Sequence, residues 1–181
     1  VKAFLASIFL DIDPNYGQGA RVPASAILLK ASSRIDNEFG DDPRLALEVA
    51  TLVSSGLMNT SQQKPALEII EAALKRYQDS LSPSDPQVLR AQRIAVAAHG
   101  WAGTLPQVAP MLPDLVAKLR NTEPLLTEEL VHALFYLGAV EFLAGRPESA
   151  VAAREEAAEL ARNRLGEHHK ASIEALSHWA S

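Results

Sequence analysis

The feature that most constrains the fold of this chain is a pair of helical patterns that recurs with a period of about 42 positions. The pair is clearest in residues 127–165, where two amphipathic stretches flank a short Ala-Gly-Arg-Pro turn. Gly103 and Gly145 are separated by one such period, and each follows the first helix of a pair. One helical hairpin cannot bury its apolar face alone, so the recurrence predicts several hairpins stacked on one another.

Start signals of the first helices repeat at nearly the same interval. Asp42-Pro43 and Asp85-Pro86 are the two clearest of these signals, and an aspartate followed by a proline is typical of a helix N-terminus. After the first of them, helical spacing predicts an apolar stripe along the helix. That stripe consists of Leu45, Val49, Leu52, Val53 and Leu57.

The positions at which the two helices of a pair should cross carry small residues. Two antiparallel helices approach closely only where the side chains between them are small, because a large side chain would hold the axes apart. These positions are Ala66, Ala109 and Ala150, followed seven residues later by Ala73, Val116 and Ala157.

The period predicts a single domain with five parts. Residues 1–41 should form an N-terminal helix pair, with helices over 1–12 and 23–39. Repeats are predicted over 42–84, 85–126 and 127–167, and residues 168–181 should form the first helix of a truncated fourth repeat. The second helix of the middle repeat contains Pro106, Pro110 and Pro113, so we expect that helix to begin late or to kink.

Composition favours helices and excludes several classes of function. Aromatic residues make up only 6% of the chain and alanine is frequent, which suits tightly packed helices better than sheets. The net charge is −5 and the basic residues are scattered, which disfavours nucleic-acid binding. There is no cysteine, so disulfides and cysteine-based metal sites or nucleophiles are excluded. The longest apolar run, residues 1–10, is shorter than the about 20 residues that span a bilayer, so we expect no membrane insertion.

In its repeated helix pairs and their small crossing residues, the chain resembles the tetratricopeptide repeat family. The resemblance is to the 42-residue variant known from kinesin light chains and many bacterial proteins. The resemblance covers residues 42–181. Glu141 replaces the family's tyrosine and Arg154 its phenylalanine. The matching positions in the third repeat are Leu134, Leu137, Gly138, Ala150 and Ala157.

The resemblance implies an all-α right-handed superhelix, or α-solenoid, of antiparallel helix pairs, with about nine helices. It also implies a concave groove, lined by the first helix of each pair, that receives a peptide or a partner helix. The family's ligand-facing positions correspond here to Glu48, Thr51, Ser55, Met58, Arg90, Arg93, His132, Phe135, Ala139 and Phe142.

Several of these groove positions have an alternative role. Phe135 and Phe142 are seven residues apart, so they share one helix face, which is either groove or core. Met58 and Trp101 occupy equivalent positions in the first and second repeats, and each can likewise be a groove residue or a core residue. A one-residue slip in the middle repeat leaves a choice between Arg90 and Ala91, and between Arg93 and Ile94. The two arginines can hold a peptide carboxylate or belong to a solvated helix face.

A second resemblance concerns the start of the chain. The segment FLASIFLDIDPNYGQGARVPASAILLKASSRI is similar to the segment that precedes the repeats in bacterial serine/threonine kinases and related signalling proteins. No kinase motif is present, so the resemblance implies a kinase only in a longer parent protein. The chain begins at Val1 rather than Met and ends within a helical pattern, and we expect it to be an excised part of such a protein. The compartment would then be the bacterial cytoplasm, or the periplasm if a membrane helix lies upstream.

The sequence therefore predicts a non-catalytic scaffold or sensor that binds a protein or peptide, with self-association as the alternative. No cofactor is expected. A metal site at His168, His169 and His178 lacks a ligand spacing, and His169 matches the linker position of Asp85. Gly17-Gln18-Gly19 lacks the third glycine and the preceding strand of a phosphate-binding loop. A triad of Ser25, His99 and an aspartate has no nucleophile elbow around it, so we expect no enzyme activity.

Overall fold

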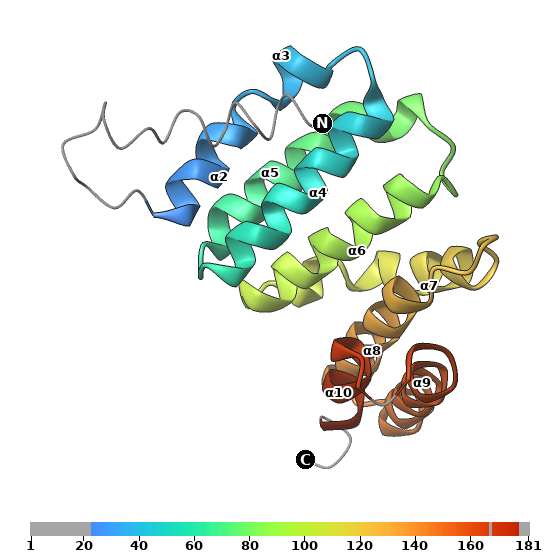
Figure 1. The fold of residues 1–181 in the computed structure, drawn as a ribbon. Coiled ribbons are helices and arrows are strands. Elements are labelled where there is room, and N and C mark those ends of the chain that lie inside the picture. Colours follow the sequence, from blue (N-terminus) through green and yellow to red (C-terminus); the bar gives the residue numbers. More distant parts are fainter. Residues whose placement is uncertain (1–22, 167, 178–181) are drawn as a thin grey trace.

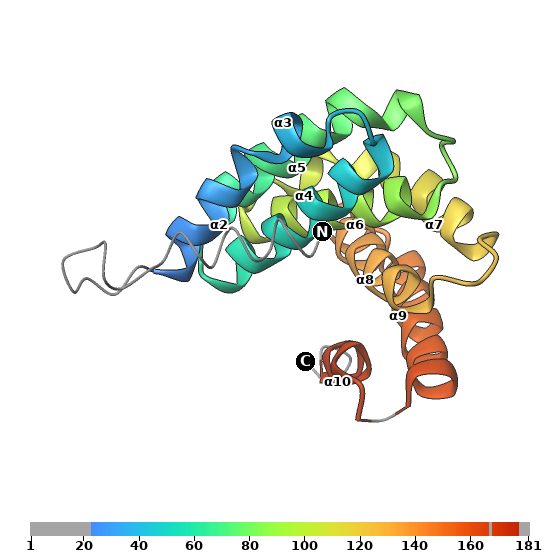
Figure 2. The ribbon, with the colours of Figure 1, turned by 45° about the horizontal axis from the view of Figure 1, so that its top comes forward.

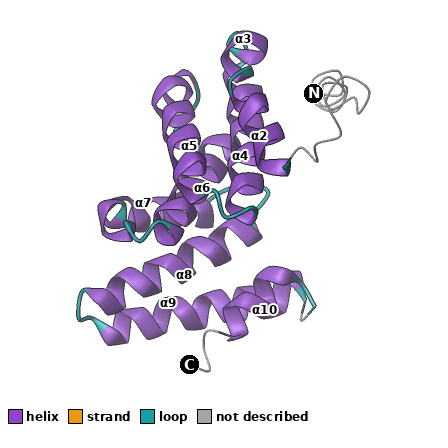
Figure 3. Cartoon of the chain, turned by 90° about the vertical axis from the view of Figure 1, so that its left-hand side faces the viewer, coloured by secondary structure: helices purple, strands orange, loops and turns teal. Residues whose placement is uncertain are grey.

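The computed structural model describes residues 23–166 and 168–177, and the regular secondary structure of this part of the chain is entirely helical. Nine α-helices, α2 to α10, pack against one another within the described residues, and no strand occurs among them (Figures 1 and 3). The prediction of an all-α protein is confirmed. The helix predicted over residues 1–12 lies outside the described residues.

The helices follow the predicted order along the chain. Short 3-10 turns at Gln78–Ser80, Leu105–Gln107 and Ala109–Met111, and a π-helical turn at Ala161–Leu165, connect or extend them. The helices are α2 (Ala24–Ser32), α3 (Ile35–Phe39), α4 (Pro43–Asn59), α5 (Gln63–Tyr77), α6 (Pro86–Trp101), α7 (Leu112–Arg120), α8 (Thr127–Leu143), α9 (Pro147–Leu160) and α10 (Lys170–Ser177).

The predicted aspartate caps are present at the starts of α4 and α6. The Asp42 carboxylate accepts a hydrogen bond from the Leu45 backbone N–H at 3.1 Å, and the Asp85 carboxylate accepts one from that of Gln87 at 2.9 Å. Each cap satisfies one of the N–H groups that a helix N-terminus leaves without a partner inside the helix. A proline follows each cap, at a position where the missing N–H costs nothing.

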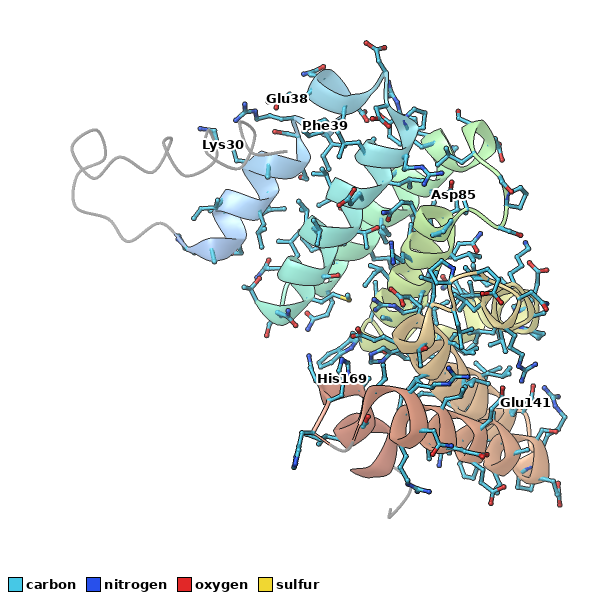
Figure 4. All side chains as sticks on the ribbon, turned by 45° about the vertical axis from the view of Figure 1, so that its right-hand side comes forward. Lys30, Glu38, Phe39, Asp85, Glu141 and His169 are labelled. Carbon is cyan, nitrogen blue, oxygen red and sulfur yellow. The ribbon has the colours of Figure 1, made fainter. Side chains whose placement is uncertain are left out.

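The prediction of one continuous helix over residues 23–39 is wrong. The helix breaks after Ser32 and resumes as α3 (Figure 4). The Ser32 hydroxyl donates to the Leu29 carbonyl at 2.8 Å, and the Ser33 hydroxyl donates to the Lys30 carbonyl at 2.9 Å. The Ser33 hydroxyl occupies the carbonyl that the Arg34 N–H would use in a continuous helix, and the Arg34 N–H donates instead to the Ala31 carbonyl at 3.1 Å. Such local bonds compete with the helix.

Contacts connect helices that are neighbours in the chain and helices that lie further apart in it. α4 with α5 and α8 with α9 form antiparallel hairpins, and the first helices contact one another in the order α4, α6, α8, α10. We call these four helices the first-helix row. The second helices α5, α7 and α9 each contact the first helix that follows. The segments α2 and α3 contact α4, and α2 and α10 lie at opposite ends of the molecule (Figures 1 and 2).

Helix α6 joins two hydrophobic cores. Val88, Ala91 and Ile94 belong to a core shared with α2 to α5, whereas Leu89 and Val96 belong to a core shared with α7 to α10. Apolar residues of α6 therefore face both cores, while Arg90 and Arg93 are half-buried and Trp101 at the end of the helix is exposed.

The turns after α4, α6 and α8 have the same geometry, and successive turns are separated by one repeat period. Ser61, Gly103 and Gly145 have φ values of 60°, 72° and 73°. In each turn the N–H of the following residue donates to the carbonyl five residues earlier, as in the Arg146 to Glu141 bond at 2.9 Å. The second element of each pair begins two residues after the left-handed residue, at Gln63, Leu105 and Pro147.

The second helix of the middle repeat begins late, as its prolines predict. Two 3-10 turns occupy residues 105–111, and α7 starts at Leu112 with Pro113 in its first turn. Ala109 lies in one of these turns and is half-buried, so it does not make the predicted close crossing. The other five predicted crossing positions are buried, at Ala66, Ala73, Val116, Ala150 and Ala157.

Gly138 is the tightest of the small contacts between α8 and α9. A Cβ atom at this glycine would lie 3.1 Å from the Ala150 carbonyl oxygen and 3.0 Å from Cγ of Arg154. The backbone of α9 therefore approaches α8 where no side chain intervenes, which agrees with the packing role expected for this position.

At the left-handed position of these turns, exchanging serine for glycine and glycine for serine should change the free energy of unfolding in opposite directions. A left-handed backbone costs an ordinary residue about 1–2 kcal/mol. Glycine avoids this cost, but part of the benefit is lost because glycine is more flexible in the unfolded chain. Ser61→Gly should therefore raise the free energy of unfolding by about 0.5–1 kcal/mol, and Gly145→Ser should lower it by a similar amount. Urea titration measures both.

Ser55→Gly serves as the control, because Ser55 lies inside α4. This change should destabilise the protein, since glycine is unfavourable in a helix interior. If Ser61→Gly also destabilises, the backbone at residue 61 does not carry the strain that its φ implies.

Candidate functional site

The predicted groove residues lie on three helices of the first-helix row. Glu48 is exposed on α4, whereas Met58 is half-buried and packs against the first core. The Thr51 hydroxyl donates to the Leu47 carbonyl at 2.7 Å, and the Ser55 hydroxyl donates to the Thr51 carbonyl at 2.8 Å. These two hydroxyls therefore offer a ligand only their acceptor lone pairs.

The predicted aromatic residues differ in exposure. Trp101 is 66% exposed and Phe142 is 63% exposed. Phe135 is half-buried and makes an edge-to-face contact with Tyr136, with ring centroids 5.4 Å apart. The Tyr136 ring lies against Gly100 of α6, where a Cβ atom would come within 2.6 Å of the ring. Phe135 is thus partly covered by Tyr136 of its own helix, whereas Trp101 and Phe142 present apolar surface to solvent.

Two further apolar side chains of the first-helix row are exposed, and sequence reasoning missed both. Leu52 on α4 is 60% exposed and so lies at the edge of the predicted apolar stripe, in which Val49, Val53 and Leu57 are buried. Ile173 on α10 is 55% exposed. Leu52 lies one residue from the core position Val53, and helical spacing alone does not separate the edge of an apolar stripe from its centre.

Ion pairs connect successive first helices. Arg44 of α4 pairs with the buried carboxylate of Asp85 at the start of α6, which is labelled in Figure 4. Arg90 of α6 pairs with Glu129 of α8 at 3.1 Å. A ligand carboxylate at Arg90 would therefore compete with a carboxylate that is already in place. Arg93 is half-buried on the same helix.

His99 links three elements from a buried position. Its side chain lies 2.9 Å from the Glu71 carboxylate through Nε2 and 2.8 Å from the Thr104 hydroxyl through Nδ1. Both ring nitrogens therefore have partners on α5 and on the turn after α6, and neither partner is Ser25. The arrangement ties α5 to the end of α6, and it does not form the triad considered from the sequence.

His169, at the other end of the row, has a capping role. Nδ1 of His169, labelled in Figure 4, accepts a hydrogen bond from the Ala171 backbone N–H at 3.2 Å at the start of α10. Asp85 caps α6 in the same way two repeat periods earlier, as the sequence predicted. His132 lies 3.8 Å from Glu128 on α8. Within the described residues, no group of three or more potential metal ligands occurs.

A cleft that the sequence did not reveal lies between the α2–α3 segment and α5. It has a volume of about 490 Å³, which is in the range of small-molecule sites. The break between α2 and α3 forms one wall, α5 forms the other, and Ala50 of α4 contributes to the lining. The lining residues are Ser32, Ser33, Ile35, Asp36, Ala50, Ile69, Ala72, Ala73, Lys75 and Arg76.

The polar edge of the cleft is built around Asp36. The Tyr77 hydroxyl donates to the Asp36 carboxylate at 2.5 Å, and Arg76 pairs with the same carboxylate at 3.0 Å. Arg76 also lies over the Tyr77 ring, 5.6 Å from its centroid. Burial, and then the hydrogen bond to Asp36, raise the pKa of Tyr77 above its usual value near 10.

Comparisons with known proteins find no family model, no curated protein and no solved structure that matches this chain. None of the helices in the described residues is long and apolar enough to span a membrane.

The Tyr77–Asp36 bond predicts a pH-dependent contribution to stability. Because the folded state holds the phenol proton more tightly than the unfolded state, the contribution is complete below about pH 10 and is lost as the pH rises through the raised pKa. Tyr77→Phe should lower the free energy of unfolding by about 1 kcal/mol at about pH 8. The difference from the parent protein should shrink by about pH 11.

Urea titrations of both proteins at the two pH values measure this difference. Parallel loss of stability in parent and variant would show that Tyr77 does not hold its proton as the geometry implies.

Proposed function

We propose that this chain is a non-catalytic binding module whose first-helix row receives a protein or peptide partner. The observation that carries the proposal is that each of the four helices in the row presents a large exposed apolar side chain. These side chains are Leu52, Trp101, Phe142 and Ile173. Exposed aromatic residues such as these two are the typical anchors of binding surfaces, since they bury large area at a small cost in entropy.

The proposal extends to the architecture and the family. The turns at residues 61, 103 and 145 share one backbone conformation, and equal steps between repeats would generate a superhelix with a concave face. We infer a right-handed superhelix of tetratricopeptide type, with the row on that face and the predicted repeat boundaries unchanged. A role as scaffold or sensor within a larger bacterial signalling protein, including one with a kinase domain, is part of the same proposal.

Photo-crosslinking tests the proposed surface while the partner is still unidentified. A photoreactive residue placed at Phe142 should capture a defined protein in cells that express the parent protein. The same residue at Glu155, which is exposed on the second helix α9, should not capture it. Equal capture at both positions would count against a binding surface on the first-helix row.

Purified partner then measures the contribution of the aromatic anchors. The double variant Trp101→Ala and Phe142→Ala should weaken binding by about 30-fold, the loss expected from removing one strong anchor of about 2 kcal/mol. Leu29→Ala is the matched control, because Leu29 is an exposed apolar residue on α2, outside the row. Unchanged affinity of the double variant would contradict the proposal.

Self-association is a second candidate function. Leu143 and Val151, near the turn between α8 and α9, are 69% and 50% exposed, so this end of the molecule carries apolar surface that a second copy can cover. Light scattering over a dilution series separates the two functions. A monomer at every concentration would exclude self-association and leave partner binding in place.

A further inference from the structure

The cleft between the α2–α3 segment and α5 is separate from the proposed partner surface. None of the predicted groove residues lines it. It exists because α2 and α3 pack mainly on α4 and the chain breaks at Ser33. Ser32, Ser33 and Asp36 lie on the same wall, at the break and just after it.

The lining combines an apolar body with a few polar groups, as small-molecule sites do. Ile35 and Ile69 face the cleft from opposite walls, and three alanines leave space between them. Ser32 and Ser33 donate their hydroxyl protons to backbone carbonyls, so their oxygens remain available as acceptors. The apolar lining disfavours a strongly hydrated ligand, because burying such a group without full hydrogen bonding is costly.

The charges of the cleft favour an anion. Asp36 is the one carboxylate in the lining, and it is already bound by Arg76 at 3.0 Å and by the Tyr77 hydroxyl at 2.5 Å. Lys75 is exposed at the edge and has no ion-pair or hydrogen-bond partner among the described residues. The cleft therefore carries one uncompensated positive charge in a chain whose net charge is −5.

We propose that this cleft binds a carboxylate attached to an apolar body, with Lys75 as its counter-ion and Ile35 and Ile69 against the apolar part. The ammonium group of Lys75 supplies charge-assisted hydrogen bonds to the carboxylate. The serine oxygens accept from a donor elsewhere on the ligand. Such a carboxylate belongs either to a free small acid or to the C-terminus of a peptide that ends in an apolar residue.

Phenylacetate is the first probe, titrated into the isotope-labelled full chain and followed by NMR. It should shift the backbone amide signals of Ser33, Ala72 and Lys75, with a dissociation constant of about 1 mM, typical of so small a ligand. Benzyl alcohol and phenethylamine test the charge, because they keep the ring and lack the carboxylate. Equal binding of benzyl alcohol, or shifts confined to Trp101 and Phe142, would overturn the proposal.

Variants of α5 test whether Lys75 is the counter-ion and whether the ligand occupies the cleft. Lys75→Gln should weaken phenylacetate binding by about tenfold, the effect of losing one charge-assisted bond. Lys64→Gln is the matched control, since Lys64 is a highly exposed lysine on the same helix outside the cleft, and it should leave binding unchanged. Ala72→Phe should abolish binding by filling the cleft while the circular dichroism spectrum stays the same. Unchanged binding in both Lys75→Gln and Ala72→Phe would overturn the assignment.

A pair of short peptides distinguishes the two sources of the carboxylate. A tetrapeptide that ends in phenylalanine with a free C-terminus is compared with its C-terminal amide. Tighter binding of the free-acid peptide than of phenylacetate assigns the cleft to a peptide C-terminus. Binding of phenylacetate alone assigns it to a free acid, and equal binding of acid and amide peptides would contradict a carboxylate site.

Discussion

The burial of α6 is the constraint on which the rest of the molecule depends. Its residues enter both hydrophobic cores, with Val88 and Ile94 on one side and Leu89 and Val96 on the other. Neither group of helices has another apolar partner of this extent among the described residues, so α6 fixes how α4–α5 stack against α7–α9. This follows from the physics of repeats, in which each hairpin becomes stable only when a neighbour covers it.

The second constraint is the conformation of three single residues. A left-handed residue follows each of α4, α6 and α8 and allows the same two hydrogen bonds in each turn. Its own N–H donates to the carbonyl three residues earlier, and the next N–H donates to the carbonyl five residues earlier. The chain then reverses in the same way three times, and each second element begins at the same distance from the turn. The regularity of the fold thus originates in backbone geometry, and glycine is present in two of the three turns because it adopts this conformation without strain.

The polar contacts described above hold neighbouring helices in position relative to one another. Arg44 and Asp85 connect α4 to α6, Arg90 and Glu129 connect α6 to α8, and His99 joins α5 to the turn after α6. Arg90 and His99 were candidates for ligand recognition or catalysis in the sequence, and the fold engages them in contacts between helices. Among the described residues, the features that our proposals assign to ligands are the exposed apolar side chains of the first-helix row and the cleft beside α5.

The sequence by itself determined the helical class, the spacing of the turns, the caps at Asp42 and Asp85, and the late start of α7. Each of these depends on local rules for proline, glycine, aspartate and apolar spacing, which act over a few residues of one chain segment. The break after Ser32, the left-handed Ser61, the exposure of Leu52 and the cleft beside α5 were decided by the tertiary structure. They depend on which neighbour covers each face and which carbonyl a hydroxyl reaches, and spacing along the sequence does not carry that information. For the same reason the sequence placed Phe135 and Phe142 on one face, whereas in the structure Phe142 is 63% exposed and Phe135 is half-buried against Tyr136.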